Sequence, residues 1–283
     1  MTILVFGKTG QVAQELAVHD GVKCLDRMAA DLTHPAACAA AIRATMPQAV
    51  INAAAYTAVD RAEEEEALAT VINGDAPTAM AQECTALGIP FVSISTDYAF
   101  DGSGEASWKP GDPTGPLGAY GRSKLAGEQG IARVGGAYGI LRTSWVVSAH
   151  GNNFVKTMRR LGVERDQLSI VADQIGGPTP ARDIAAACLS MAQQLTEDAD
   201  KAGIYHFSGA PDVSWAGFAR AIFGELETDC DVTDIPSSQY PTPARRPLNS
   251  RLDCSSLETS FGITRPDWRQ GLSDILRELE DAS

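Results

Sequence analysis

The sequence predicts an α/β fold, a doubly wound and mainly parallel sheet followed by a smaller C-terminal domain. Two observations predict it. Roughly the first 150 residues alternate short apolar runs with longer helical patterns, which is typical of βαβ units. A glycine-rich turn also follows the first apolar run and opens a helical pattern, as in Rossmann-type sheets. With 283 residues, 44% of them hydrophobic, the chain is long enough for such a sheet and an annex.

Five short apolar runs in this region are the expected parallel strands, and longer stretches with helical spacing separate them. The strands are Ile3–Phe6, Lys23–Leu25, Ala49–Asn52, Phe91–Ser95 and Tyr138–Leu141. The helices are Gln11–Val18, Pro35–Met46 with its opening proline, Asp60–Val71, Pro77–Leu87 and Tyr120–Ala132. Crossovers of this kind place helices on both faces of the sheet.

The pattern loosens after Arg142, where we expect the chain to leave the main sheet and re-enter it. Residues 1–149 are predicted to form the dinucleotide-binding Rossmann domain, and residues 150–283 mainly a substrate-binding domain. The segment around 168–200, with a strand at Leu168–Val171 and a helix at Arg182–Leu195, is expected to return to the first domain. The proline-dense stretch 236–247 should be a shaped loop, because proline cannot pair as a central strand.

Charge and composition exclude several classes of protein. A net charge of −13, from 36 acids and 23 bases, argues against nucleic acid or an anionic membrane as a partner. No apolar run has the length of a membrane span, and the N-terminus begins a strand at once, so a cytoplasmic protein is expected. The six cysteines and four histidines are widely spaced, which predicts reduced thiols and no metal site or hydrolase triad.

The glycine-rich turn after the first strand predicts a dinucleotide site. Glycines at 7 and 10 permit a tight turn and a close approach of a pyrophosphate to the helix N-terminus, where free N–H groups favour anions. Ala13, in place of a third glycine, is still small enough for packing of the helix on the strand. The residues expected to contact the cofactor here are Gly7, Thr9, Gly10, Gln11 and Val12.

Further cofactor contacts are expected where the next strands end. Asp26 lies about 20 residues after the turn, where an acid binds the ribose hydroxyls of NAD, while the adjacent Arg27 suits the 2′-phosphate of NADP. Cofactor preference is therefore open. Asp31 and Leu32 are candidates for the adenine end, and the small residues after the third strand let backbone approach the cofactor. Those residues are Ala53, Ala54 and Ala55, followed by Tyr56.

The chemistry is predicted by residues at the end of the fourth strand and the start of the next long helix. Tyr120 and Lys124 are four residues apart, so they share a helix face, and the ammonium is expected to lower the pKa of the phenol towards neutrality. Such a phenol is a usable general acid. Thr96, at the carboxyl end of a neighbouring strand, would hydrogen-bond the same carbonyl oxygen. Together they predict a site for carbonyl reduction.

These segments resemble the dTDP-4-dehydrorhamnose reductase family of extended short-chain dehydrogenases, and the resemblance covers nearly the whole chain. They are FGKTGQVA at 6–13, NAAAYTAVDRAE at 52–63, STDYAFDG at 95–102, YGRSKLAGE at 120–128, LRTSWV at 141–146, GNNFVKTM at 151–158 and YPTPARRPLNSRLD at 240–253. The glycine-rich and YxxxK segments are shared by many relatives. The Arg-Thr-Ser-Trp, Gly-Asn-Asn-Phe and Thr-Pro-Ala-Arg-Arg-Pro segments are much more specific to this family.

The resemblance implies an enzyme in which Thr96, Tyr120 and Lys124 form the catalytic triad. The implied cofactor is NADPH, with NADH possible, and the implied substrate is a dTDP-6-deoxy-4-keto-hexose reduced at C4 to dTDP-L-rhamnose. The implied assembly is a monomer or homodimer. Residues matching the family's substrate site are Val59, Asp97, Trp145 and Asn153, and Arg246 with Asn249 lies in the segment resembling its nucleotide-contacting loop.

Two departures from the family pattern carry expectations of their own. Tyr56 stands where relatives often have histidine, which affects cofactor contacts and leaves proton delivery by Tyr120 intact. Some members bind Mg²⁺ at a dimer interface through glutamates, which Glu15 and Glu278 match. Arg182, however, stands where another acid is expected. An added cation there disfavours a metal, so neither Mg²⁺ nor that dimer is expected.

Two rival functions stay open at this point. One is a non-catalytic regulatory subunit that keeps the reductase fold to bind nucleotide and a partner; the intact Thr96, Tyr120 and Lys124 speak against it. The other is an epimerase or dehydratase acting on a different nucleotide sugar. Asp97 keeps a dehydratase open, although no Glu follows it to complete an acid–base pair.

Overall fold

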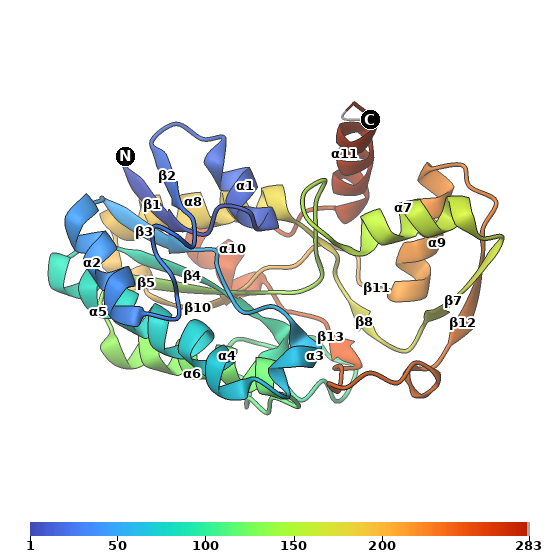
Figure 1. The fold of residues 1–283 in the computed structure, drawn as a ribbon, viewed down its shortest axis with the longest axis horizontal. Coiled ribbons are helices and arrows are strands. Elements are labelled where there is room, and N and C mark those ends of the chain that lie inside the picture. The colour runs from blue at the N-terminus through green and yellow to red at the C-terminus, as the bar shows by residue number, and fades with distance from the viewer. Residues whose placement is uncertain (282–283) are drawn as a thin grey trace.

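A six-stranded parallel sheet forms the centre of the larger lobe in the computed structural model, which describes residues 1–281 (Figure 1). Across the sheet the strands follow the order β2, β1, β3, β4, β5, β10. The order reverses between β1 and β3, so the carboxyl ends of the strands leave a crevice at that point. The strands are β2 (Val22–Leu25), β1 (Ile3–Phe6), β3 (Ala49–Asn52), β4 (Phe91–Thr96), β5 (Tyr138–Thr143) and β10 (Gly203–His206).

Helices cover both faces of this sheet, as the alternating pattern predicted. Side chains of β1 alternate between two cores: Ile3 and Val5 pack on one face, Leu4 and Phe6 on the other. None of the helices within residues 1–281 is long and apolar enough to span a membrane. The first face carries α1 (Gln11–Ala17), α8 (Ala181–Glu197) and α10 (Ser255–Phe261), and the second carries α2 (Pro35–Thr45), α5 (Ala76–Leu87) and α6 (Ala119–Val134).

The smaller lobe, at the right of Figure 1, has a separate apolar core. Its helices are α7 (Phe154–Glu164), α9 (Trp215–Glu225) and α11 (Trp268–Asp281), and its parallel strand pair is β7 (Gln167–Val171) with β12 (Asp231–Ile235). Short pairings lie between the lobes: β6 (Val146–Val147) with β9 (Thr179–Pro180), and β8 (Ile175–Gly176) with β11 (Val213–Ser214) and β13 (Asn249–Ser250). The loop 236–247 contains only a short 3-10 turn at 237–239.

The segment 168–200 returns to the main sheet later than expected. β7 pairs with β12 in the smaller lobe, so the return begins only at α8 and is completed by β10 beside β5. The local pattern of β7 identified a strand correctly. The sheet that β7 joins depends on its partner β12, which lies far along the chain, and no local sequence pattern predicts that these two strands pair.

The predicted helices at 60–71 and 77–87 differ most from the structure. The first is broken into α3 (Val59–Ala62) and α4 (Glu66–Thr70), and α4 then continues through a π-helical turn at Val71–Asp75 directly into α5. Pro77 was expected to start a new helix. Pro77 has no N–H to donate to the Asn73 carbonyl, and the wider π turn accommodates that missing hydrogen bond without ending the helix.

The Asn73 carbonyl makes a close contact with α6 that is possible only because residue 127 is glycine. A Cβ on Gly127 would collide with the Asn73 carbonyl oxygen. We therefore expect Gly127→Ala to lower the free energy of unfolding by about 1–3 kcal/mol, measured by urea denaturation. The matched control is Gly224→Ala in α9, where a Cβ meets nothing within 4 Å, so the helix should be unchanged or more stable. Equal stabilities of the two variants would contradict this packing argument.

Candidate functional site

Two adjoining cavities lie at the carboxyl ends of the strands. One, of about 630 Å³, is lined by the glycine-rich turn, the end of β2 and the segment after β3. The other, of about 610 Å³, runs from the start of α1 to the ends of β4 and β5 and on to the smaller lobe. They share Thr9, Gly10, the segment 53–55 and Thr57 as lining, and so form one elongated cleft. A cleft of this shape suits a dinucleotide with a second ligand beside it.

The glycine-rich turn has the geometry of an anion site. Gly7 adopts a φ of +114°, and a Cβ there would lie 3.3 Å from the Ala53 backbone and 3.4 Å from the Ala13 Cβ. Gly10 precedes α1 without any side-chain cap, so the first N–H groups of the helix stay available to a ligand. Because the helix dipole also favours negative charge, a pyrophosphate fits here.

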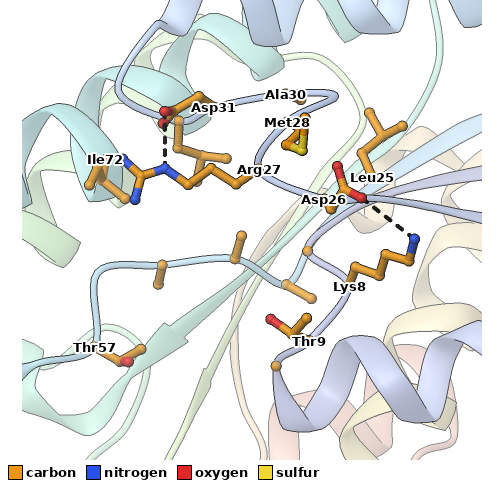
Figure 2. Close-up of a pocket in the computed structure, with 16 residues that line it drawn as sticks. Lys8, Thr9, Leu25, Asp26, Arg27, Met28, Ala30, Asp31, Thr57 and Ile72 are labelled. Atoms are coloured by element: carbon orange, nitrogen blue, oxygen red, sulfur yellow. Dashed lines mark hydrogen bonds and ion pairs between the residues drawn. The ribbon is translucent and has the colours of Figure 1, made fainter.

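Figure 2 shows the cavity next to this turn, where two ion pairs line the wall. Lys8 Nζ lies 3.5 Å from Asp26 Oδ2, and Arg27 Nε donates to Asp31 Oδ2 at 3.0 Å. The backbone N–H of Thr33, together with Arg27, lowers the pKa of Asp31 to about 2. Asp31 and its neighbour Leu32 both line the cavity. Lys8 was not singled out as a site residue in the sequence.

Thr96, Tyr120 and Lys124 line the second cavity together. Thr96 ends β4, Tyr120 is the second residue of α6, and Lys124 lies one helical turn further on. Lys124 Nζ donates a hydrogen bond of 2.7 Å to the Ile94 carbonyl on β4, and burial lowers the pKa of this lysine to about 8. The three residues thus line the same part of the cleft, where the Thr96 hydroxyl acts on the Tyr120 phenol.

The expectation that Lys124 makes the Tyr120 phenol acidic is wrong for this structure. Burial raises the pKa of Tyr120 to about 12, the Thr96 hydroxyl opposes the rise, and the Asp97 carboxylate adds to it. Lys124 is not among the groups that shift the pKa of this phenol, and its ammonium donates to the Ile94 carbonyl. The phenol therefore keeps its proton at neutral pH, which is the state a proton donor requires.

Asp97 is a buried acid with unfilled hydrogen-bonding capacity. Its Oδ1 accepts from the Thr96 hydroxyl at 3.1 Å, whereas Oδ2 has no hydrogen-bond partner within the described part of the chain. Burial raises the pKa of Asp97 to about 6, and the hydroxyls of Ser250 and Thr96 oppose the rise, although no hydrogen bond of good geometry joins Ser250 to Oδ2. Oδ2 belongs to a residue that lines the cleft, so a ligand hydroxyl is its natural partner.

An aromatic wall closes the far end of the cleft. Trp145, with a φ of +48°, stacks on Trp215 with ring centroids 3.6 Å apart and planes 11° from parallel. The Trp215 Nε1 donates to Gln174 Oε1 at 3.2 Å, and all three residues line the cavity, as does Val59. Trp215 and Gln174 were missed in the sequence, because they come from the smaller lobe and no local motif marks them.

Four predicted site residues do not line either cavity, and their side chains are engaged elsewhere. The Tyr56 hydroxyl donates to Glu65 at 2.5 Å, and Arg246 Nη2 donates to Asp60 Oδ2 at 2.8 Å. Asn249 donates to two carbonyls of the 103–106 loop. Asn153, the fourth, caps α7 with its side-chain oxygen. Pro247 and Ser250, which flank Asn249, line the cleft instead.

A buried ion pair joins α6 to the sheet. The Arg142 guanidinium on β5 binds both carboxylate oxygens of Glu128 on α6, at 2.6 Å for the Nη2 contact, and the Ser95 hydroxyl donates to the same carboxylate at 2.5 Å. Both side chains of the pair are at most 3% exposed. His206 of β10 lies 3.4 Å from Arg142, and its pKa is lowered to about 3 by burial and that cation. These contacts tie α6 to β4, β5 and β10.

The residues that suggested a family Mg²⁺ site do not fit a divalent cation. Glu15 and Glu278 flank the His150 ring, at 3.5 Å and 3.7 Å from Nε2, and Arg182 acts on Glu15 as a positive charge. Within residues 1–281 no three His, Cys, Asp or Glu side chains are grouped as metal ligands would be. The His150 imidazole and the Arg182 guanidinium stand beside the two glutamates, where Mg²⁺ would need further oxygen ligands.

Comparisons with known proteins agree with this geometry. Residues 1–281 match the family model described as the RmlD substrate binding domain. The dTDP-4-dehydrorhamnose reductases of Sinorhizobium fredii and Burkholderia thailandensis are 43% and 44% identical, over 99% of this chain and 98% and 99% of theirs. The crystal structure of dTDP-4-dehydrorhamnose reductase from Bacillus anthracis in complex with NADP is similar with a TM-score of 0.90, at 34% identity over 98% of this chain and all of the other. The chain therefore belongs to the dTDP-4-dehydrorhamnose reductase family.

Proposed function

We propose that the protein reduces the C4 keto group of dTDP-4-dehydro-L-rhamnose to a hydroxyl, giving dTDP-L-rhamnose, with a reduced nicotinamide dinucleotide as cofactor. The observation that carries the proposal is the convergence of Thr96, Tyr120 and Lys124 on a cleft that continues to the N-terminus of α1. Relatives of this length and similarity are reductases of that sugar. The acid, the carbonyl-polarising hydroxyl and the anion site thus stand in one continuous space.

The roles of the side chains follow from their positions. The bound nicotinamide supplies a hydride. Tyr120 holds a proton that its raised pKa keeps in place at neutral pH, and donates it to the oxygen of the ketone. The Thr96 hydroxyl, which donates to Asp97 Oδ1 in this structure, would turn to the same oxygen and polarise the carbonyl. Lys124 is held in place by its hydrogen bond to the Ile94 carbonyl. In this position its ammonium can donate to hydroxyls of the cofactor and supplies positive charge to the site.

The test is a turnover assay with purified protein, NADPH and enzymatically generated dTDP-4-dehydro-L-rhamnose, followed by absorbance of the reduced nicotinamide. We expect oxidation that depends on the sugar and a product that co-elutes with dTDP-L-rhamnose. Binding of NADPH without oxidation in the presence of this or any other keto sugar would favour a regulatory subunit. Release of water or inversion of a centre without net oxidation would favour a dehydratase or epimerase.

Asp97 is proposed to bind a substrate hydroxyl at the cost of stability. The pKa of Asp97 is about 6 in the folded protein and 3.8 in an ordinary carboxyl. The protonated carboxyl therefore favours the folded state fully below about pH 4, and this contribution to the free energy of unfolding is lost as the pH rises through 6. Asp97→Asn cannot ionise. We therefore expect this variant to be about 3 kcal/mol more stable than the wild type in urea at pH 8 and similar to it at pH 4. Its KM for the sugar should rise; equal stabilities at pH 8 would contradict the assignment.

The cofactor preference is proposed to favour NADPH, with NADH also accepted. Lys8 and Arg27 are largely exposed and stand at the ribose end of the first cavity, where they can leave their aspartate partners to bind a 2′-phosphate (Figure 2). Asp26 and Asp31 remain there to accept hydroxyls of the unphosphorylated ribose. The relative from B. anthracis was solved in complex with NADP, which agrees with this choice.

The double variant Lys8→Ala/Arg27→Ala should therefore raise the KM for NADPH about tenfold or more and change the KM for NADH by less than about twofold. Each lost charge-assisted contact is worth roughly 1.5–3 kcal/mol, partly screened at this open position. Initial rates with each cofactor measure it. Arg43→Ala, which breaks an exposed ion pair with Glu83 away from the cavity, is the control. A rise of the same size for both cofactors would show that the two cations do not recognise the phosphate.

A cytoplasmic location and a monomeric or homodimeric state remain our proposals for the setting of this reaction. They agree with a strongly acidic chain that acts on small, soluble, nucleotide-linked sugars. Size-exclusion chromatography with light scattering gives the assembly directly.

A further inference from the structure

The side chain of Gln11 joins the glycine-rich turn to a distant loop. Gln11 is the first residue of α1 and lines the cleft beside the proposed anion site. Its Nε2 donates to the Val146 carbonyl at 3.3 Å, and its Oε1 accepts from Ser148 Oγ at 2.9 Å and from Asn153 Nδ2 at 3.0 Å. The nitrogen and the oxygen of this amide are therefore both hydrogen-bonded to one segment, 146–153, about 140 residues further along the chain.

That segment belongs to the substrate side of the cleft. Trp145, Val146, Gly151 and Asn152 line the cavity that holds Thr96 and Tyr120. Gly151 packs on the Gln11 side chain, because a Cβ on this glycine would lie 3.6 Å from Gln11 Cγ. The conformation of the loop therefore depends on where Gln11 is held.

Asn153, expected to bind substrate, is instead the centre of this connection. Its Nδ2 donates to Gln11 and to the carbonyls of Ser148 and His150, and its Oδ1 accepts from the backbone N–H of Lys156 at the start of α7. Ser148 is 1% exposed, so water does not replace these contacts easily. A continuous set of hydrogen bonds thus leads from the pyrophosphate turn to the loop and to the first turn of α7 in the smaller lobe.

We propose that Gln11 is a positioning residue that couples cofactor binding to sugar-nucleotide binding. The proposal rests on the proposed function. A pyrophosphate held by the first N–H groups of α1 fixes the Gln11 backbone, and the Gln11 amide then holds the loop in the form that lines the sugar side. By linkage, each ligand strengthens the binding of the other by the same factor.

The experiment measures the Kd of dTDP-L-rhamnose by calorimetry, with and without saturating NADPH, two ligands that cannot react together because both are reduced. The ratio of the two Kd values is the coupling factor. We expect NADPH to tighten the wild-type Kd at least about fivefold. Gln11→Ala should bring this factor to within about twofold of one, while each ligand alone still binds.

Gln14→Ala is the matched control. Gln14 is on the same helix and its amide donates to the Thr9 carbonyl at 2.9 Å, without reaching the 146–153 loop, so its coupling factor should equal that of the wild type. Should Gln11→Ala fail to fold, Ser148→Ala removes one donor to Gln11 from the loop side and should lower the factor in the same direction.

The outcomes separate the two proposals. A wild-type factor of one, or the same factor in Gln11→Ala and wild type, overturns the coupling inference even when turnover is normal. A fall in the affinity for both ligands with an unchanged factor also overturns it, because that result indicates a structural role only. A wild type that binds NADPH and no dTDP-L-rhamnose contradicts the proposed function itself.

Discussion

Replacing Tyr120 by Phe should lower the turnover number by about 10²–10⁴-fold while leaving the Kd for NADPH nearly unchanged. The ring keeps its place beside Tyr98, with ring centroids 5.5 Å apart, and only the hydroxyl is lost. This phenol carries its proton throughout the neutral range, whereas Thr96 is a poor acid and Asp97 is mostly ionised above pH 6. The Lys124 ammonium also keeps a proton there, but it donates to the Ile94 carbonyl. Stopped-flow absorbance of the reduced nicotinamide measures the rate.

Tyr205→Phe is the control for this variant. The Tyr205 hydroxyl donates to the Lys201 carbonyl at 2.7 Å, outside both cavities, so its removal should not change turnover. Normal turnover by Tyr120→Phe would refute the proton-donor assignment. Loss of NADPH binding by the same variant would mean that the hydroxyl holds the cofactor more than it serves the reaction.

Replacing Arg142 by Leu should lower the free energy of unfolding by about 3–5 kcal/mol, the largest effect on stability that we expect from a single change. The substitution leaves the Glu128 carboxylate buried without its cation, and an unpaired buried charge is far more costly than a lost surface contact. Because the Ser95 hydroxyl binds the same carboxylate one residue before Thr96, the end of β4 should be disturbed too. Urea denaturation followed by circular dichroism measures the loss.

Two further variants separate pairing from simple packing. Arg122→Leu breaks a bidentate pair with Glu66 that is 45% and 43% exposed, and should cost less than about 1 kcal/mol. The double variant Glu128→Leu/Arg142→Leu removes both charges and should recover much of the stability lost in Arg142→Leu. A loss below about 1 kcal/mol for Arg142→Leu alone would show that the carboxylate finds another partner or takes up a proton at little cost.

The parts of the fold that local sequence determines were predicted well. The predicted strands begin and end within two residues of β1 to β5, because each is a short apolar run bounded by polar residues. The glycine-rich turn and the YxxxK spacing also identified two parts of the cleft lining, since both motifs depend on residues close together in the chain. The helical region 59–87 was predicted less well: Pro77 was expected to start a helix, but it is accommodated by a π turn whose Asn73 carbonyl packs closely on Gly127 of α6.

By itself, the sequence determined the parallel sheet and the glycine-rich turn and predicted Tyr120 as the proton donor, since each follows from neighbouring residues whose conformation is set locally. Only the tertiary structure decided which side chains face the cleft. Trp215 joins Trp145 from the other lobe, Asn153 and Asn249 turn to backbone partners, and Lys124 donates to β4 instead of acidifying the phenol. The physical reason is that burial and the nearest polar partner set the orientation and pKa of a side chain, and both come from residues far away in the chain.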